Sequence, residues 1–241
     1  MPCSKPIATR SGWIEGVGLK LHGVAMSPFV QRVLIAAQIK GVDLELVALP
    51  AGGLGSPEFA ALSPMRRIPV LEEADGWTLS ESSAIVGYLE DSRPGPSLLP
   101  GNARDAATVR MIDSIVDCEV TAGLRHFVVQ KLFCAYSEPK LLDHGREQLA
   151  RGLDAIERIG VGRAGPWLIG DRPTMADAAL IPFMLLGELI ALISDAGDMI
   201  SGRPGIDAWW AQASATPYSI QAKEDMTRQF RTVLARKESE A

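Results

Sequence analysis

The feature that most constrains the fold is a proline-rich segment that divides the chain into two unlike parts. Residues 91–101 hold three prolines and two glycines, a composition typical of a linker because both residue types interrupt helices and strands. Strand and helix patterns alternate before this segment, and only helical patterns follow it. The sequence therefore predicts an α/β domain over residues 19–90 and an all-helical domain over residues 102–235, with residues 1–18 as a flexible N-terminal extension.

The first helix of the α/β domain has clear signals at both ends. Ser27 and Pro28 are residue types preferred at the N-cap and the first helical position. Apolar residues then recur at i, i+3, i+4 and i+7 spacing across 30–37. Gly41 fits the C-cap, where glycine adopts a left-handed conformation easily. A helix from Pro28 to about residue 40 follows.

Short apolar or alternating segments predict the strands around this helix. We expect them at residues 19–22, 42–46, 68–71 and 77–79. Asp75-Gly76 is a hairpin signal between the last two. A second helix begins at Ser82 or Ser83 and runs to about Glu90. The order strand–helix–strand–strand–strand–helix predicts a small sheet packed against helices, and this unit is complete within about 75 residues.

Composition excludes several functional classes. The chain carries 24 Lys plus Arg and 29 Asp plus Glu, a net charge of −5, whereas nucleic-acid binding needs clustered positive charge. The three cysteines (Cys3, Cys118 and Cys134) are odd in number and widely spaced, so they form neither a disulfide framework nor a zinc site. The three histidines lack ligand spacing. We expect no bound metal and no nucleic-acid partner.

One apolar stretch could be read as a membrane span. Residues 178–193 are apolar over 16 positions but include a proline, a glycine and Glu188, whereas a span needs ~20 residues with few charges. Thr174 and Asp177 open this stretch in the manner of a capping box, so we predict a buried core helix. Residues 1–17 show no secretory signal. The expectation is a cytoplasmic protein without membrane contact.

Four short segments follow one another along the chain in an order that is typical of one protein family. They are Ser27-Pro-Phe-Val-Gln-Arg-Val33, Arg66-Arg-Ile-Pro-Val-Leu71, Glu81-Ser-Ser-Ala-Ile85 and Asp171-Arg-Pro-Thr-Met-Ala-Asp-Ala178. Together they resemble the cytosolic glutathione transferase family over roughly residues 19–225, and most of all its serine-type members, the tau class and related bacterial proteins. The resemblance implies a thioredoxin-like glutathione-binding domain, a helical domain that supplies most of the pocket for a second substrate, and a homodimer.

Ser27 is the residue on which the implied chemistry depends. Glutathione reacts as its thiolate, and a free thiol has a pKa of ~8.5. Lowering that pKa by about two units needs ~2.7 kcal/mol, and a hydrogen bond to a charged group (~1.5–3 kcal/mol) with a helix N-terminus (~0.3–1 kcal/mol) can supply it. Spacing alone favours a plain helix cap, because serine is common at that position. The resemblance implies that Ser27 is catalytic, because serine-type members place the thiolate-stabilising hydroxyl there.

The resemblance also implies which residues hold glutathione. Ile68, before a cis Pro69, would pair with the cysteinyl backbone. Glu81 and Ser82 would hold the ammonium and carboxylate of the γ-glutamyl residue, and Arg67 would help hold the glycyl carboxylate. Each has a structural alternative, namely an edge-strand proline or a helix cap with an acidic first turn.

Two parts of the site are less defined. The tau pattern has a lysine in the loop that corresponds to residues 51–56, where this chain has none, so the group that replaces it is not identified. Phe29, Met111, Ile115 and Cys118 would line the second-substrate pocket or simply pack in the core.

The implied activity is conjugation of the glutathione thiolate to small hydrophobic electrophiles. A glutathione-dependent isomerase, dehalogenase or peroxidase, or a non-catalytic glutathione-binding protein, stays open as an alternative. Zeta-class isomerases carry a Ser-Ser-Cys run at the first helix, where this chain has Ala25-Met26-Ser27. Thiol transferases need a cysteine at the catalytic position, and Ser27 cannot form a mixed disulfide.

Overall fold

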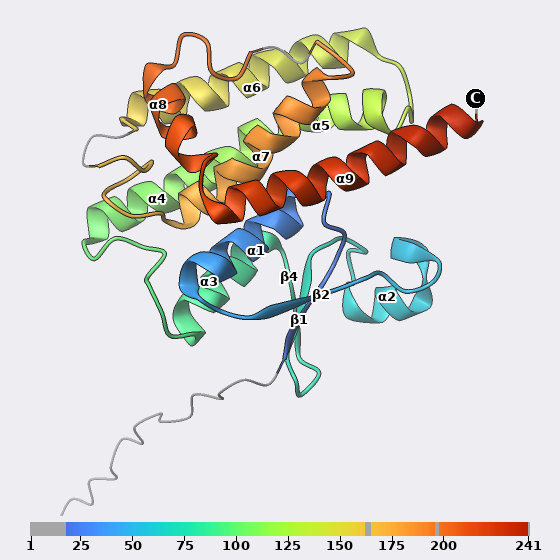
Figure 1. The fold of residues 1–241 in the computed structure, drawn as a ribbon, viewed down its shortest axis with the longest axis horizontal. Coiled ribbons are helices and arrows are strands. Elements are labelled where there is room, and N and C mark those ends of the chain that lie inside the picture. Colours follow the sequence, from blue (N-terminus) through green and yellow to red (C-terminus); the bar gives the residue numbers. More distant parts are fainter. Residues whose placement is uncertain (1–17, 162–164, 196–197, 241) are drawn as a thin grey trace, which may run out of the picture.

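The computed structural model describes residues 18–161, 165–195 and 198–240. The N-terminal extension expected at residues 1–18 lies, apart from Gly18, outside the described residues. The described chain forms an α/β domain followed by a helical domain, as the sequence predicts (Figure 1).

The α/β domain has a four-stranded mixed sheet. Its elements are β1 (Leu19–His22), α1 (Pro28–Lys40), β2 (Leu44–Val47), the 3₁₀ turn η1 (Gly53–Gly55), α2 (Pro57–Leu62), β3 (Val70–Glu72), β4 (Thr78–Ser80) and α3 (Ser82–Ser92). The strand order is β2-β1-β3-β4. β1 is parallel to β2 and antiparallel to β3, which is antiparallel to β4. Helices α1 and α3 lie between the sheet and the helical domain (Figure 1).

The observed elements depart from the sequence prediction in two places. The β3–β4 turn is longer than the two residues expected, because Glu73 and Trp77 still pair through their backbones and leave a three-residue turn closed by Gly76 at φ 85°. Helix α2 was not predicted. Its signal was present, since the Ser56 side chain accepts a hydrogen bond from the Phe59 N–H and proline follows at the first helical position.

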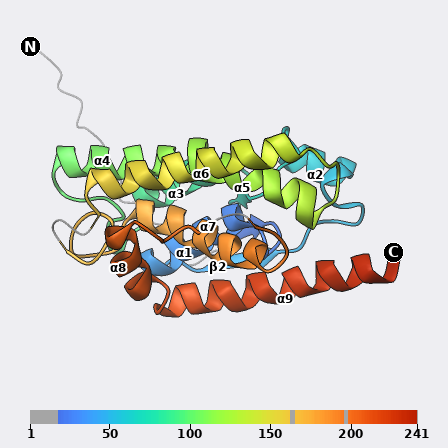
Figure 2. The ribbon, with the colours of Figure 1, turned by 90° about the horizontal axis from the view of Figure 1, so that it is seen from above.

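The helical domain is built around one apolar helix. Its elements are α4 (Ala103–Ile115), the π-helical turn η2 (Val116–Val120), α5 (Thr121–Phe127), the π-helical turn η3 (Val128–Leu132), α6 (Pro139–Ile159), α7 (Met175–Ala191), α8 (Pro204–Ala213) and α9 (Pro217–Glu240). Seen from above, α7 lies between the layer of α4 and α6 on one side and α9 on the other (Figure 2). This position explains why nearly every α7 residue is buried.

Helix α7 begins at the predicted capping box. The buried Asp177 carboxylate accepts hydrogen bonds from the backbone N–H and the hydroxyl of Thr174, at 2.7 and 2.8 Å. It also accepts from the Leu168 N–H and the Trp209 indole N–H. Burial raises the pKa of Asp177, and these four donors oppose that rise. Within the described ranges, no helix combines the length and apolarity needed to cross a membrane.

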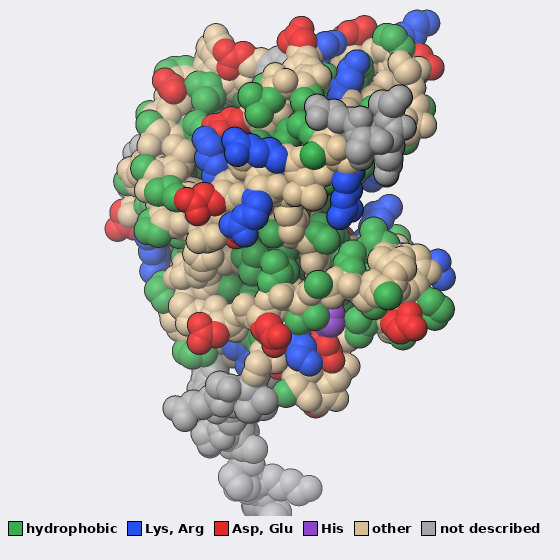
Figure 3. All heavy atoms as spheres, turned by 45° about the vertical axis from the view of Figure 1, so that its right-hand side comes forward, with side chains coloured by type: hydrophobic (Ala, Val, Ile, Leu, Met, Phe, Trp, Pro, Cys, Tyr) green, Lys and Arg blue, Asp and Glu red, His purple; other side chains and the backbone are tan. Residues whose placement is uncertain are grey.

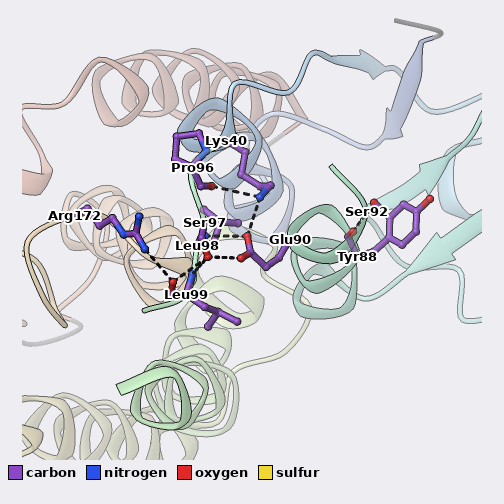
Figure 4. Close-up of polar contacts among 9 residues, drawn as sticks. All are labelled: Lys40, Tyr88, Glu90, Ser92, Pro96, Ser97, Leu98, Leu99 and Arg172. Atoms are coloured by element: carbon purple, nitrogen blue, oxygen red, sulfur yellow. Dashed lines mark hydrogen bonds and ion pairs between the residues drawn. The ribbon is translucent and has the colours of Figure 1, made fainter. Parts of the chain in front are cut away.

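A buried ion pair fixes the linker between the two domains. Glu90, near the end of α3, accepts from the Lys40 ammonium at 2.8 Å and from the Leu98 N–H at 2.9 Å, and also from the Ser97 hydroxyl (Figure 4). The side chains of Lys40 and Glu90 are only 2% and 12% exposed. The end of α1 and the linker are therefore held by one carboxylate, which explains why a proline-rich segment can have a fixed path.

We expect Glu90→Gln to lower the free energy of unfolding by about 3 kcal/mol at pH 7, because it leaves the Lys40 charge buried without a partner. Burial alone would raise the pKa of Glu90, but the hydrogen bonds from Leu98, Lys40 and Ser97 outweigh it and hold that pKa below its ordinary value of 4.5. A depressed pKa stabilises the folded state above pH 4.5, and this stabilisation is lost as the pH falls through the lowered pKa.

Urea unfolding at pH 7, 5 and 3.5 measures both effects. The difference between the wild type and Glu90→Gln should shrink at the lowest pH. The exposed Glu45→Gln is the matched control and should change stability by less than ~0.5 kcal/mol. A Glu90→Gln protein as stable as this control would contradict the role of the ion pair.

Candidate functional site

Three strand ends bring the predicted site segments together. In the sheet register His22 pairs with Val70, and Val70 pairs with Ser80. The loop that leads to Ser27 begins directly after His22, the Ile68–Pro69 peptide comes directly before Val70, and Glu81 follows Ser80. The fold therefore brings together, at one end of the strands, three motifs that are up to 60 residues apart in sequence. This proximity does not by itself test their roles.

Ser27 is the N-cap of α1, as predicted, but its side chain does not cap the helix. Its backbone is extended (φ −71°, ψ 123°), and its hydroxyl makes no hydrogen bond to any other described residue. The first turn of α1 contains Pro28 and no acidic residue. A hydroxyl donor is thus available at the positive end of a 13-residue helix, where a negative charge is stabilised.

The Ile68–Pro69 peptide is cis, as the resemblance predicts. Ser63 fixes the segment before it, since its hydroxyl accepts from the Arg67 N–H at 3.1 Å and donates to the Arg67 carbonyl at 3.0 Å. The Arg67 side chain itself is exposed. Its guanidinium is accessible to an anionic group of a ligand, and its contact with a glycyl carboxylate stays a prediction.

Glu81 and Ser82 differ in their surroundings. Glu81 is exposed and has a positive φ of 71°, a conformation rare for a residue with a Cβ and found preferentially at functional sites. Ser82 is 5% exposed, and its hydroxyl accepts a hydrogen bond from Arg32 at 3.2 Å. The backbone at the start of α3 is therefore held in an uncommon conformation beside a buried cation.

Arg32, a charged residue with four polar partners at the site, was not predicted from the sequence. Its side chain is 1% exposed and donates to Ser83 at 2.6 Å as well as to Ser82. Its second terminal nitrogen lies 2.8 Å from Asp117 and 3.9 Å from Asp113. One arginine therefore joins α1, the start of α3 and the helical domain. The available signal was a lone arginine inside the apolar pattern of α1.

The two aspartates lie one helical turn apart and face the same cation. Ser83 donates to Asp117 at 2.8 Å. Burial raises the pKa of Asp113, and the neighbouring Asp117 charge adds to that rise, whereas Arg32 and Ser83 oppose it. The two carboxylates therefore share one buried cation, whose attraction favours their charged forms.

The residues predicted for the second-substrate pocket are not gathered in the same way. Phe29 packs edge-to-face on Phe183 of α7, with ring centroids 5.3 Å apart. Met111 is 46% exposed and Cys118 is also exposed. At about 100° per residue both lie on a different face of their helix from Asp113. Their assignment to the pocket, and that of the partly buried Ile115, rests on the sequence alone.

A hollow separates the lobe that contains α2 from the helical domain, with Lys and Arg side chains along its upper edge (Figure 3). In the part of the chain that the structure describes, no three His, Cys, Asp or Glu residues form a potential metal site. The arrangement offers a hydroxyl at a helix start, a cis proline peptide and the exposed guanidinium of Arg67, which suits a small anionic peptide-like ligand.

Comparisons with known proteins agree with this organisation. The glutathione S-transferase N-terminal domain matches residues 21–97, and the glutathione S-transferase C-terminal domain matches residues 139–209. Maleylacetoacetate isomerase of Rattus norvegicus is 34% identical over 63% of this chain and 69% of the relative. Glutathione S-transferase 3 of Zea mays is 31% identical over 83% of this chain and 90% of the relative.

A solved structure extends the likeness to three dimensions. Maleylacetoacetate isomerase from Methylobacterium extorquens AM1, crystallised with malonate and glutathione bound, superposes with a TM-score of 0.70 at 27% identity, over 85% of this chain and 95% of that one. A thioredoxin-like domain joined to a helical domain is the glutathione transferase fold. The chain belongs to the glutathione S-transferase family.

Arg32→Met should lower the free energy of unfolding by about 3 kcal/mol, because it removes the cation that compensates two partly buried carboxylates. Asp117 keeps some access to water, which holds the loss at the low end of the range. Urea unfolding measures it, with Arg228→Met as the matched control, since Arg228 is 71% exposed in its ion pair with Asp225. Equal stability of the two variants would show that Arg32 does not stabilise the junction between the domains.

Proposed function

We propose that this protein is a glutathione S-transferase that conjugates the glutathione thiolate to small hydrophobic electrophiles. The observation that carries the proposal is the unengaged Ser27 hydroxyl at the start of α1, at the same end of the sheet as the cis Ile68–Pro69 peptide. Further support comes from relatives named glutathione S-transferase and from a similar structure with glutathione bound. The finer assignment to a tau-like serine type is part of the proposal.

The proposed chemistry assigns one task to each segment. Ser27 donates its O–H to the sulfur and, with the positive end of α1, keeps it anionic near neutral pH. Ile68 pairs with the cysteinyl backbone, Glu81 and Ser82 hold the γ-glutamyl group, and Arg67 attracts the glycyl carboxylate. The thiolate attacks an electrophilic carbon and the leaving group departs with its electron pair. Binding both reactants supplies proximity.

A second candidate is a glutathione-dependent cis–trans isomerase. It is favoured by the 34% identity to a maleylacetoacetate isomerase. Here the thiolate adds to a carbon–carbon double bond, rotation follows, and elimination returns the thiolate unchanged, so glutathione is not consumed. The site lacks the Ser-Ser-Cys run of zeta-class isomerases and has Ala25-Met26-Ser27 instead, which is why conjugation is placed first.

Consumption of glutathione distinguishes the two reactions. The protein is assayed with glutathione and 1-chloro-2,4-dinitrobenzene, an enone or a peroxide, and separately with glutathione and maleylacetoacetate. Stoichiometric loss of the free thiol with an aryl halide or an enone supports conjugation, whereas turnover of maleylacetoacetate at constant thiol supports isomerisation. Retention on glutathione-agarose without turnover of any substrate would favour a binding protein.

We also propose that the protein is a homodimer, as the family resemblance implies. Sedimentation velocity at micromolar concentration should give a species of about twice the chain mass of 25.8 kDa. A single 26 kDa species would contradict the dimer.

Ser27→Ala should keep the fold and lower kcat for conjugation at pH 6.5 at least about tenfold, because it removes a hydrogen bond to a charged sulfur. The pH at which bound glutathione ionises, followed by thiolate absorbance, should rise toward the free thiol value of ~8.5. Ser114→Ala, at an exposed position on α4, is the control. Unchanged turnover together with an unchanged pH profile would refute the role of Ser27.

A further inference from the structure

The loop that carries Ser27 is held by two glutamines from different parts of the chain. Gln31 on α1 donates its side-chain N–H to the Ala25 carbonyl at 2.7 Å. Gln229 on α9 accepts, at its Oε1, a hydrogen bond of 2.8 Å from the Met26 backbone N–H. Gln229 is 203 residues from Met26, so the C-terminal helix directly contacts the backbone one residue before the proposed catalytic serine.

The position of the Ser27 hydroxyl depends on this backbone. Because its side chain does not cap α1, no local hydrogen bond of its own fixes the oxygen. The loop is held instead through main-chain groups: the Gly23 N–H donates to the Val47 carbonyl at 3.1 Å and the Ser27 N–H to the Val24 carbonyl at 3.0 Å. The Met26 N–H bonds to Gln229, so a movement of that glutamine is transmitted directly to Ser27.

Helix α9 is firmly seated, which makes Gln229 a fixed acceptor. Ala222, Met226 and Phe230 follow one another at four-residue spacing and are at most 1% exposed. They anchor one face of the helix, which contacts both α1 and α7 (Figure 2). Gln229 directly precedes Phe230 and is half-buried. The glutamine is therefore presented by a helix whose place is set by burial of its neighbours.

The other flank of Ser27 is also held by the helical domain. Phe29, two residues after Ser27, packs edge-to-face on Phe183 of α7. Contacts from α9 and α7 thus enclose the four residues 26–29. The hydrogen bond from the Met26 N–H to Gln229 is directional, whereas the ring contact of Phe29 restricts only the volume available to its side chain. The hydrogen bond therefore defines the orientation of the peptide before Ser27.

We propose that Gln229 is a positioning residue for the thiolate chemistry: it holds the Met26 amide so that the Ser27 hydroxyl is aimed at the glutathione sulfur. This inference rests on the proposed function. It differs from a substrate contact, since Gln229 acts through Met26, and from simple packing, since its action depends on one acceptor oxygen.

The test compares Gln229→Met with Gln221→Met. Methionine has similar length but no strong acceptor. Gln221 is an exposed glutamine two turns earlier on the same helix, and among the described residues its amide bonds to Asp225. We measure hydrogen–deuterium exchange of the Met26 amide, the ionisation pH of bound glutathione, and kcat and KM for conjugation, with Ser27→Ala in parallel.

Gln229→Met should accelerate exchange at Met26 and raise the ionisation pH of bound glutathione by about half a unit. We expect kcat to fall about fivefold while the KM for glutathione stays within about twofold, because misalignment affects the reacting atoms more than the rest of the ligand. Gln221→Met should match the wild type in every measurement.

Four outcomes separate this inference from the proposed function. Unchanged exchange at Met26 means that the contact is not made in solution, and it overturns the inference. Faster exchange with an unchanged pH profile and kcat overturns it as well, since the contact is then merely structural. Unchanged turnover together with an unchanged pH profile in Ser27→Ala refutes the role of Ser27 in the proposed function, whereas a shift in Ser27→Ala without one in Gln229→Met overturns only the role of Gln229.

Discussion

The ion pairs and hydrogen bonds of the buried Arg32 side chain connect more parts of the site than those of any other charged residue described above. It meets Ser82 and Ser83 at the start of α3, and Asp113 and Asp117 on the helical domain. A fully buried guanidinium is costly unless its donors find partners, and these partners come from three separate elements. The helical domain thus supplies the carboxylates that compensate the charge of the arginine bound to the start of α3.

Local signals in the sequence predict much of this fold. Ser27-Pro28 and Gly41 mark the ends of α1, and Thr174 with Asp177 marks the start of α7, because capping satisfies backbone groups within a few residues. The cis Ile68–Pro69 peptide was predicted only through family resemblance, as spacing alone leaves an ordinary edge-strand proline equally acceptable. Sequence signals work where the partner of a group is a near neighbour.

The residues that were not predicted from the sequence have partners that are far away along the chain. Arg32 finds Asp117 and Ser82 at separations of 85 and 50 residues, and Gln229 finds Met26 across 203. No local pattern specifies such pairs, since an arginine in an apolar helix or a glutamine on an amphipathic one is also compatible with solvent exposure. Met111 and Cys118 were proposed as pocket residues from the sequence, but both side chains are exposed in the fold. A sequence pattern could not decide this, because exposure depends on which helices pack against each face.

The helical domain contacts the segments of the α/β domain that carry the candidate site. Phe183 and Gln229 contact the residues on either side of Ser27, and Asp117 anchors the arginine that reaches Ser82. In the proposed function, the thioredoxin-like domain supplies the donors for the bound tripeptide, and the contacts from Phe183 and Gln229 help to orient the segment that carries Ser27. Since proximity and orientation account for a large part of rate enhancement, changes in the helical domain can alter turnover without touching either substrate.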